Sequence, residues 1–118
     1  MVIEVPDLTR PALRLAKTNP KIGDEVASLG YGYGLERPMF RTTHISDDET
    51  YIHENGIGGP FMVTDDVCVG GQSGGPVINH AGEVVLIVQR GGGGVGMGVG
   101  AEMIRAKVGR FFGKAQVP

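Results

Sequence analysis

The sequence predicts an all-β domain: a small closed barrel of about six antiparallel strands that ends in one helix. Glycine accounts for 21 of the 118 residues, tryptophan is absent, and valine and isoleucine recur in short runs. Outside a collagen repeat, this much glycine indicates many turns, bulges and close approaches between backbones. Short apolar runs of even spacing, separated by turn residues, are typical of barrels.

The chain opens with a short strand and a long connection. Residues 2–5 favour a strand, which the following proline ends because it lacks an amide donor. Residues 6–22 contain three prolines and are expected to be extended. Residues 24–29 place apolar side chains at Val26 and Leu29, and this pattern predicts the next strand.

The middle of the chain predicts a hairpin. Residues 37–45 and 50–54 are the expected strands, and the polar sequence SDDE at 46–49 is the expected turn between them. A further short strand is expected after this hairpin, at residues 61–64. Loops are expected at the glycine-rich segments 30–34 and 55–60.

The last third of the chain predicts three strands and a helix. Strands are expected at 76–79 and 83–89, joined by the tight-turn sequence HAG. Residues 90–94 are glycine-rich and are expected to be a flexible connection. Residues 95–100 alternate Val and Met with Gly, which predicts a strand pressed closely on another backbone. Residues 101–112 carry apolar side chains at helical spacing, at Met103, Ile104, Val108, Phe111 and Phe112.

Composition and charge exclude several classes of function. The net charge is −2 and no basic run is present, so nucleic acid is not an expected partner. No apolar run is long enough for a membrane span, and the first residues lack the layout of a signal peptide. Cys68 is the only cysteine, which fits a reducing, cytoplasmic compartment. No zinc or calcium ligand set is present, and no cofactor is expected.

One stretch carries a recognisable chemistry. Residues 64–76 read TDDVCVGGQSGGP and resemble T-D-x-x-x-x-x-G-N-S-G-G-P, the nucleophile loop of the HtrA/Deg branch of trypsin-like serine proteases. Three other segments resemble that branch in the same order: KIGDEVASLGYGYG, NHAGEVV and VGMGVGAEMIRAKV. The resemblance covers residues 21–112 and implies the second, Greek-key barrel of that fold. The resemblance also implies a division of the chain into a strand end and linker at residues 1–22, the barrel and helix at 23–112, and a tail at 113–118.

The resemblance also implies roles for individual residues. Ser73 would be the nucleophile of an acyl-enzyme mechanism, and the N–H groups of Gly71 and Ser73 would form the oxyanion hole. The segment Ile87, Val88 and Gln89 would pair with the substrate backbone. The pocket for the residue before the cut would be bordered by Val67, Cys68 and the loop 91–94, which together hold no buried acid. That pocket is therefore expected to be apolar or small. Gln72 departs from the Asn or Asp that the family prefers.

The base and the orienting acid of the family lie on a preceding barrel. The family's Asp begins a strand of the form D-(I/L)-A-(L/V)-I-x-V, and alignment of MVIEV with it puts Met1 at the Ala position. The chain is thus expected to begin just after that Asp and to be inactive by itself. His80 is expected to be a solvated turn residue. His44 and His53, on the predicted hairpin, would approach Ser73 only in a rearranged barrel.

Three functions stay open at this point. The first is the nucleophile-bearing half of a serine endopeptidase, with a polypeptide as substrate and a complementary His/Asp barrel as partner. The second is a non-catalytic structural or assembly module, for example a viral one. The third is a rewired hydrolase with His44 or His53 as its base. An isolated second barrel would expose the face that packs on the first, so a homo-oligomer is also expected.

Overall fold

A computed structural model of the chain describes residues 11–31, 36–53, 56, 58–65, 74–92 and 95–111. The strand expected at 2–5 and most of the loop at 30–34 lie outside these residues. The elements are β1 (Glu25–Gly30), β2 (Met39–Ile52), β3 (Gly58–Thr64), β4 (Pro76–Ile78), β5 (Val84–Gly92), β6 (Val95–Gly100), α1 (Ala101–Val108) and the 3-10 turn η2 (Gly109–Phe111).

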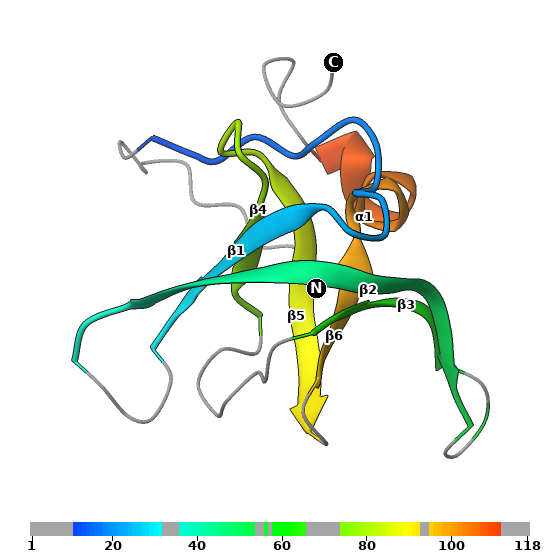
Figure 1. Ribbon diagram of the computed structural model, residues 1–118. Coiled ribbons are helices and arrows are strands. Elements are labelled where there is room, and N and C mark those ends of the chain that lie inside the picture. Colours follow the sequence, from blue (N-terminus) through cyan, green and yellow to red (C-terminus); the bar gives the residue numbers. More distant parts are fainter. Residues whose placement is uncertain are drawn as a thin grey trace.

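The strands close into one antiparallel barrel in the order β1-β2-β3-β6-β5-β4 (Figure 1). The first three strands follow one another as neighbours, and the chain then returns so that β4 pairs with β1 through Ala27 and Ile78. A fourth strand that lies beside the first is the Greek-key arrangement. The predicted six-stranded Greek-key barrel with a C-terminal helix is therefore confirmed.

The predicted hairpin at residues 37–54 is wrong, because β2 runs unbroken through the polar sequence SDDE. Asp47 accepts hydrogen bonds from the Thr50 hydroxyl and the Asp48 amide. The pairing register between β2 and β3 shifts three times between Ile45 and Ile52, so the strand passes this segment through bulges. The segment has no glycine or proline to reverse the chain, and its polar side chains bond locally instead. His44 consequently lies within β2, and His53 directly follows this strand.

The glycine-rich segment at residues 90–94 is not a flexible connection as far as it is described. β5 continues to Gly92 and pairs there with Val95, the first residue of β6. The close approach predicted for 95–100 is confirmed at Gly98. A Cβ atom at this position would lie 2.2 Å from Cδ2 of Leu86 and 2.3 Å from the carbonyl oxygen of Ile87.

The barrel interior holds one apolar core, to which the linker contributes. Strand residues with at most 3% of their surface exposed fill it: Val26, Ile45, Met62, Val77, Val85, Leu86 and Val88. Leu15 and Ala16 of the linker and Ala101 of α1 join the same cluster. Leu15 also forms a parallel bridge with Val84. The part of the linker around Leu15 and Ala16 therefore belongs to the folded barrel.

The helix α1 begins with a cap that comes from the linker. Its N-cap residue is Gly100, which has no side chain to bond the first amides. The Glu102 amide donates to Oδ1 of Asn19 at 3.0 Å, and the Asn19 amide donates to the Glu102 carboxylate at 2.8 Å. The Arg105 guanidinium donates to the carbonyl oxygen of Ala16 at 2.8 Å. Within the described ranges, no helix is long and apolar enough to cross a membrane.

Candidate active site

The exit of the segment that contains Ser73 is fastened to β5. Gly74 adopts φ +85°, a left-handed conformation that favours glycine. Its amide donates to the Val88 carbonyl at 2.7 Å, and the Val88 amide donates to the Gly75 carbonyl at 3.0 Å. The Val88 side chain is buried in the core. The residue that directly follows Ser73 is thus held against the rigid centre of the barrel.

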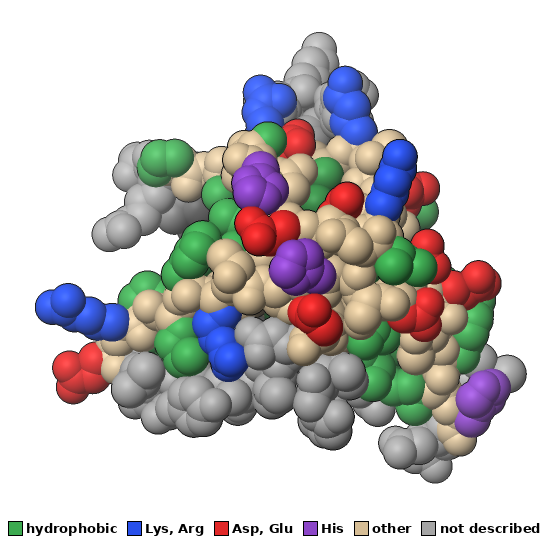
Figure 2. All heavy atoms as spheres, in the orientation of Figure 1, with side chains coloured by type: hydrophobic (Ala, Val, Ile, Leu, Met, Phe, Trp, Pro, Cys, Tyr) green, Lys and Arg blue, Asp and Glu red, His purple; other side chains and the backbone are tan. Residues whose placement is uncertain are grey.

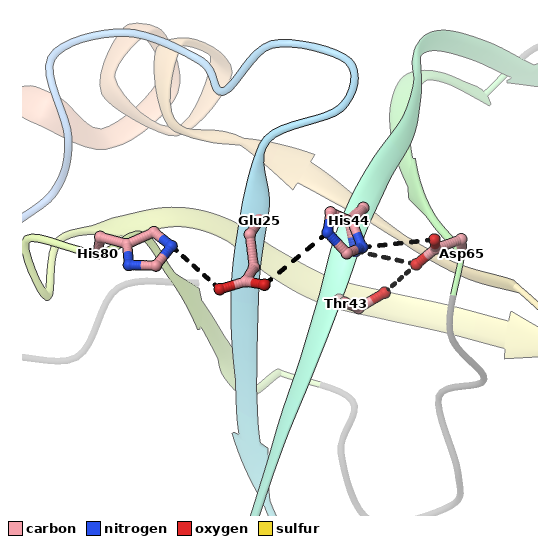
Figure 3. Close-up of polar contacts among 5 residues, drawn as sticks. All are labelled: Glu25, Thr43, His44, Asp65 and His80. Atoms are coloured by element: carbon pink, nitrogen blue, oxygen red, sulfur yellow. Dashed lines mark hydrogen bonds and ion pairs between the residues drawn. The ribbon is translucent and has the colours of Figure 1, made fainter.

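The entry of the same segment is held by Asp65, the residue after β3. Its Oδ1 atom accepts a hydrogen bond from the Thr43 hydroxyl at 2.5 Å and another from the His44 amide at 2.9 Å (Figure 3). The Asp65 amide donates to the His44 carbonyl at 3.1 Å. The bond from Thr43 does most to hold the pKa of the Asp65 carboxyl below its ordinary value, followed by the bond from the His44 amide.

A row of alternating carboxylates and imidazoles continues from Asp65 across the barrel surface. Nδ1 of His44 lies 3.7 Å from Oδ2 of Asp65, and Nε2 of His44 lies 3.9 Å from Oε2 of Glu25. Nε2 of His80 lies 3.1 Å from the other Glu25 oxygen (Figure 3). Figure 2 shows acidic and histidine side chains gathered on this face. All these side chains are at least 46% exposed, so each pair contributes little to the free energy of folding.

The described contacts of the histidines are with carboxylates. His44 lies between Asp65, which faces its Nδ1 atom, and Glu25, which faces its Nε2 atom. His80 lies in the β4–β5 turn and is exposed, as predicted, with Glu25 as its neighbour. His53 directly follows β2 and is exposed.

The predicted site residues divide into two groups. Ser73 and Gly71, with the pocket residues Val67 and Cys68, lie outside the described residues. The structure describes all three residues of the predicted substrate strand.

The structure brings one of these three, Val88, directly to the end of the Ser73 segment. Ile87 is 36% exposed and lies between Pro76 of β4 and Val99 of β6. Gln89 is also exposed. Beyond it, β5 pairs with β6 as far as Gly92, and no described residue of β4 is in register with that stretch.

Thr43, His44 and Asp65 form the contact that sequence reasoning missed. The Thr-Asp pair that opens the loop motif was the available signal, but the donors to Asp65 lie 22 and 21 residues upstream, on another strand. In the described part of the chain, no group of three or more His, Cys, Asp or Glu side chains is arranged to hold a metal ion.

A family model described as the trypsin-like peptidase domain matches residues 1–87. The chain belongs to this family. This trypsin-like domain is 35% identical, over 86 residues, to a probable periplasmic serine endoprotease, DegP-like, of Hahella chejuensis (strain KCTC 2396). That match covers 72% of the domain and 18% of the relative. The predicted resemblance to the HtrA/Deg branch is confirmed.

Solved structures similar to the trypsin-like domain share its fold. The HtrA-type protease AlgW with a tripeptide superposes with a TM-score of 0.74 at 21% identity, covering 98% of the domain and 40% of that chain. The active form of the Rv3671c protease of M. tuberculosis gives 0.72 at 22% identity, covering 96% and 53%. The domain spans less than a fifth of its DegP-like relative and about half or less of these two chains.

Proposed function

We propose that this trypsin-like domain supplies the nucleophile and the oxyanion hole of a serine endopeptidase. Its substrates are polypeptides, and Ser73 forms the acyl-enzyme. The observation that carries the proposal is the loop TDDVCVGGQSGGP together with its two described ends. Asp65 fastens the entry to β2, and Gly74 and Gly75 fasten the exit to β5. A loop fixed at both ends on a closed barrel is suited to preorganise a reactive group.

The chemistry follows from this assignment. The Ser73 Oγ atom attacks the scissile carbonyl carbon while its proton passes to a base, and the carbonyl oxygen becomes an oxyanion bound by the amides of Gly71 and Ser73. The base then gives the proton to the leaving amine as the peptide bond breaks. Water attacks the resulting ester through the same base and releases the acid and free Ser73.

The base and its orienting acid come, in this proposal, from a His/Asp barrel on the same or another polypeptide. The support for this part is the family resemblance, which places both residues on a preceding barrel, and the described neighbours of His44, which are the carboxylates Asp65 and Glu25. Without that barrel, the oxyanion hole and substrate binding support only a small residual rate. The domain alone is then close to inactive.

Substrate binding uses the far part of β5 in this proposal. Ile87 pairs with Pro76 of β4 and Val99 of β6, Gln89 lies at the register shift between Val88 and Arg90, and the next residues pair with β6 as far as Gly92. An extended peptide would add to this part of β5 as an antiparallel strand beside the end of the Ser73 segment. The contacts proposed for it are those of Ile87, Val88 and Gln89.

A fluorophosphonate probe tests the assignment because it reacts with activated serines. We expect slow or no labelling of the chain alone. Addition of a His/Asp barrel of the trypsin-like family, in trans or fused before residue 1, is expected to accelerate labelling at Ser73 by about a thousandfold. Peptide mapping locates the adduct, and Ser73→Ala is the control. Absence of a Ser73 adduct with both arrangements contradicts the proposal and favours the non-catalytic module, whose assembly Ser73→Ala leaves intact.

A further inference from the structure

We infer that Asp65 is a positioning residue for the nucleophile. Its carboxylate, held by Thr43 and His44 of β2, fixes the point at which the chain leaves β3 toward Ser73. This inference rests on the proposed role of Ser73. It assigns to Asp65, which lies outside the expected triad and the oxyanion hole, a part in keeping the nucleophile in place.

The two ends of the segment are held in different ways. At the exit, the two hydrogen bonds of the described residues join backbone groups of Gly74, Gly75 and Val88. At the entry, one carboxylate oxygen collects two donors from adjacent residues of β2. Hydrogen bonds to an ionised acceptor are about twice as strong as neutral ones. The entry is therefore the end at which one side chain controls the path of the chain.

The donors to Asp65 are themselves fixed. Thr43 is 5% exposed, so packing holds its hydroxyl in place, and the His44 amide belongs to the β2 backbone. Among the described residues, the charged groups that face the carboxylate are His44 from β2 and, on the far side of that ring, Glu25 from β1. His80 contacts Glu25 and lies one step further away. A rigid strand thus presents both donors at a set angle to the start of the loop.

The chain contains a matched comparison for this contact. Asp47 also accepts from a threonine hydroxyl, that of Thr50, and from a backbone amide, that of Asp48. These bonds stay within β2, and none of them reaches the segment before Ser73. Removal of the Asp47 carboxylate therefore removes the same kinds of hydrogen bond without releasing the loop.

The decisive experiment compares substitutions at Thr43, Asp65 and Asp47 in the protein supplied with its His/Asp barrel. We expect Thr43→Val, which keeps the volume and loses the hydroxyl, and Asp65→Ala to lower kcat about tenfold. KM is expected to stay within about twofold, because Asp65 does not lie on the substrate edge of β5. Thr43→Ser restores the hydroxyl and is expected to restore kcat. Asp47→Ala is expected to leave kcat unchanged.

A second measurement keeps the inference testable if Ser73 is never reactive. Amide hydrogen exchange of residues 66–73 in the full chain is expected to accelerate about tenfold in Thr43→Val and Asp65→Ala, but not in Thr43→Ser or Asp47→Ala. If Ser73 is not labelled but the amide exchange rates differ among the variants as expected, only the proposed function is overturned. Equal effects of Asp65→Ala and Asp47→Ala, or a Thr43→Ser variant no better than Thr43→Val, overturn the positioning role of Asp65.

Discussion

Asp65 precedes the segment that carries Ser73, and Gly74 follows it. Each position depends on a property of its residue type. Asp65 supplies an ionised acceptor where two donors of β2 converge. Gly74 supplies a left-handed turn, at φ +85°, that brings its amide onto the Val88 carbonyl. The first is a requirement for charge and the second a requirement for backbone conformation. Substitutions at the two positions are therefore expected to fail for different physical reasons.

The charge at Asp65 predicts how stability depends on pH. Hydrogen bonds from Thr43 and the His44 amide hold the pKa of the Asp65 carboxyl below its ordinary value of 3.8. A carboxyl with a lowered pKa in the folded state stabilises the fold above the unfolded-state pKa, and this contribution is lost as the pH falls through the folded-state pKa. Between about pH 5 and pH 3, the free energy of unfolding of Asp65→Asn should fall less steeply than that of the wild type. Urea titrations at both pH values measure this, and parallel declines would contradict it.

Gly74 predicts a loss that comes from conformation and not from crowding. No described heavy atom lies within 4 Å of a Cβ built at this position, but an alanine at φ +85° is strained. We expect Gly74→Ala to lower the free energy of unfolding by about 1 to 2 kcal/mol. Gly23→Ala is the matched control, with φ +93° and equally open surroundings. Similar stability losses are expected, whereas labelling of Ser73 should slow only in Gly74→Ala; equal labelling in both would contradict this view.

At the scale of elements, the contact between β5 and β6 depends on space. Gly98 lies under Leu86 and the Ile87 carbonyl, and the second of these is backbone that has no freedom to rotate away. We expect Gly98→Ala to lower the free energy of unfolding by about 3 kcal/mol, more than either loop glycine. Denaturant unfolding followed by circular dichroism measures the difference. A loss no larger than that of Gly23→Ala would show that the strands separate at little cost.

The elements also show how far the sequence could predict this fold and site. The periodicity of β1, β4 and β5, the turn at HAG and the helical spacing after residue 100 are local patterns, and each was predicted. The bulges of β2 were not predicted. Asp47 accepts hydrogen bonds from the Asp48 amide and the Thr50 hydroxyl, so this polar segment stays in the strand and does not form a turn. The motif predicted Ser73 and its loop. It did not predict the donors to Asp65, since that contact depends on the register of β2 against the end of β3.

The start of α1 predicts a coupling between the linker and the helix. Asn19 caps the Glu102 amide in place of a side chain on Gly100, and Glu102 returns a bond to the Asn19 amide. We expect Asn19→Ala to lower the free energy of unfolding by about 1 kcal/mol. The exposed neighbour Thr18 provides the control as Thr18→Ala. Asn19 and Glu102 hydrogen-bond each other, so the double variant is expected to lose less free energy of unfolding than the sum of the losses of Asn19→Ala and Glu102→Ala. A loss equal to that sum would contradict the reciprocal cap.

At the scale of the whole molecule, several large apolar side chains of the described residues are exposed. Phe40 is 63% exposed, Tyr31 54% and Ile87 36%. Such surface favours association, either with a His/Asp barrel or with a second copy of the chain. We propose that the two partners compete for one face of the barrel.

This competition gives a prediction for the assembly state. We expect the chain alone to form a defined oligomer at micromolar concentration, and addition of the His/Asp barrel to replace it with a one-to-one complex. Light scattering coupled to gel filtration, with native mass spectrometry, measures both states. Phe40→Ser is expected to weaken the oligomer, while Tyr51→Ser, at a 43% exposed position near the end of β2, serves as the control. A monomer at every concentration contradicts self-association. An oligomer that persists beside the added barrel shows instead that the two contacts use different faces.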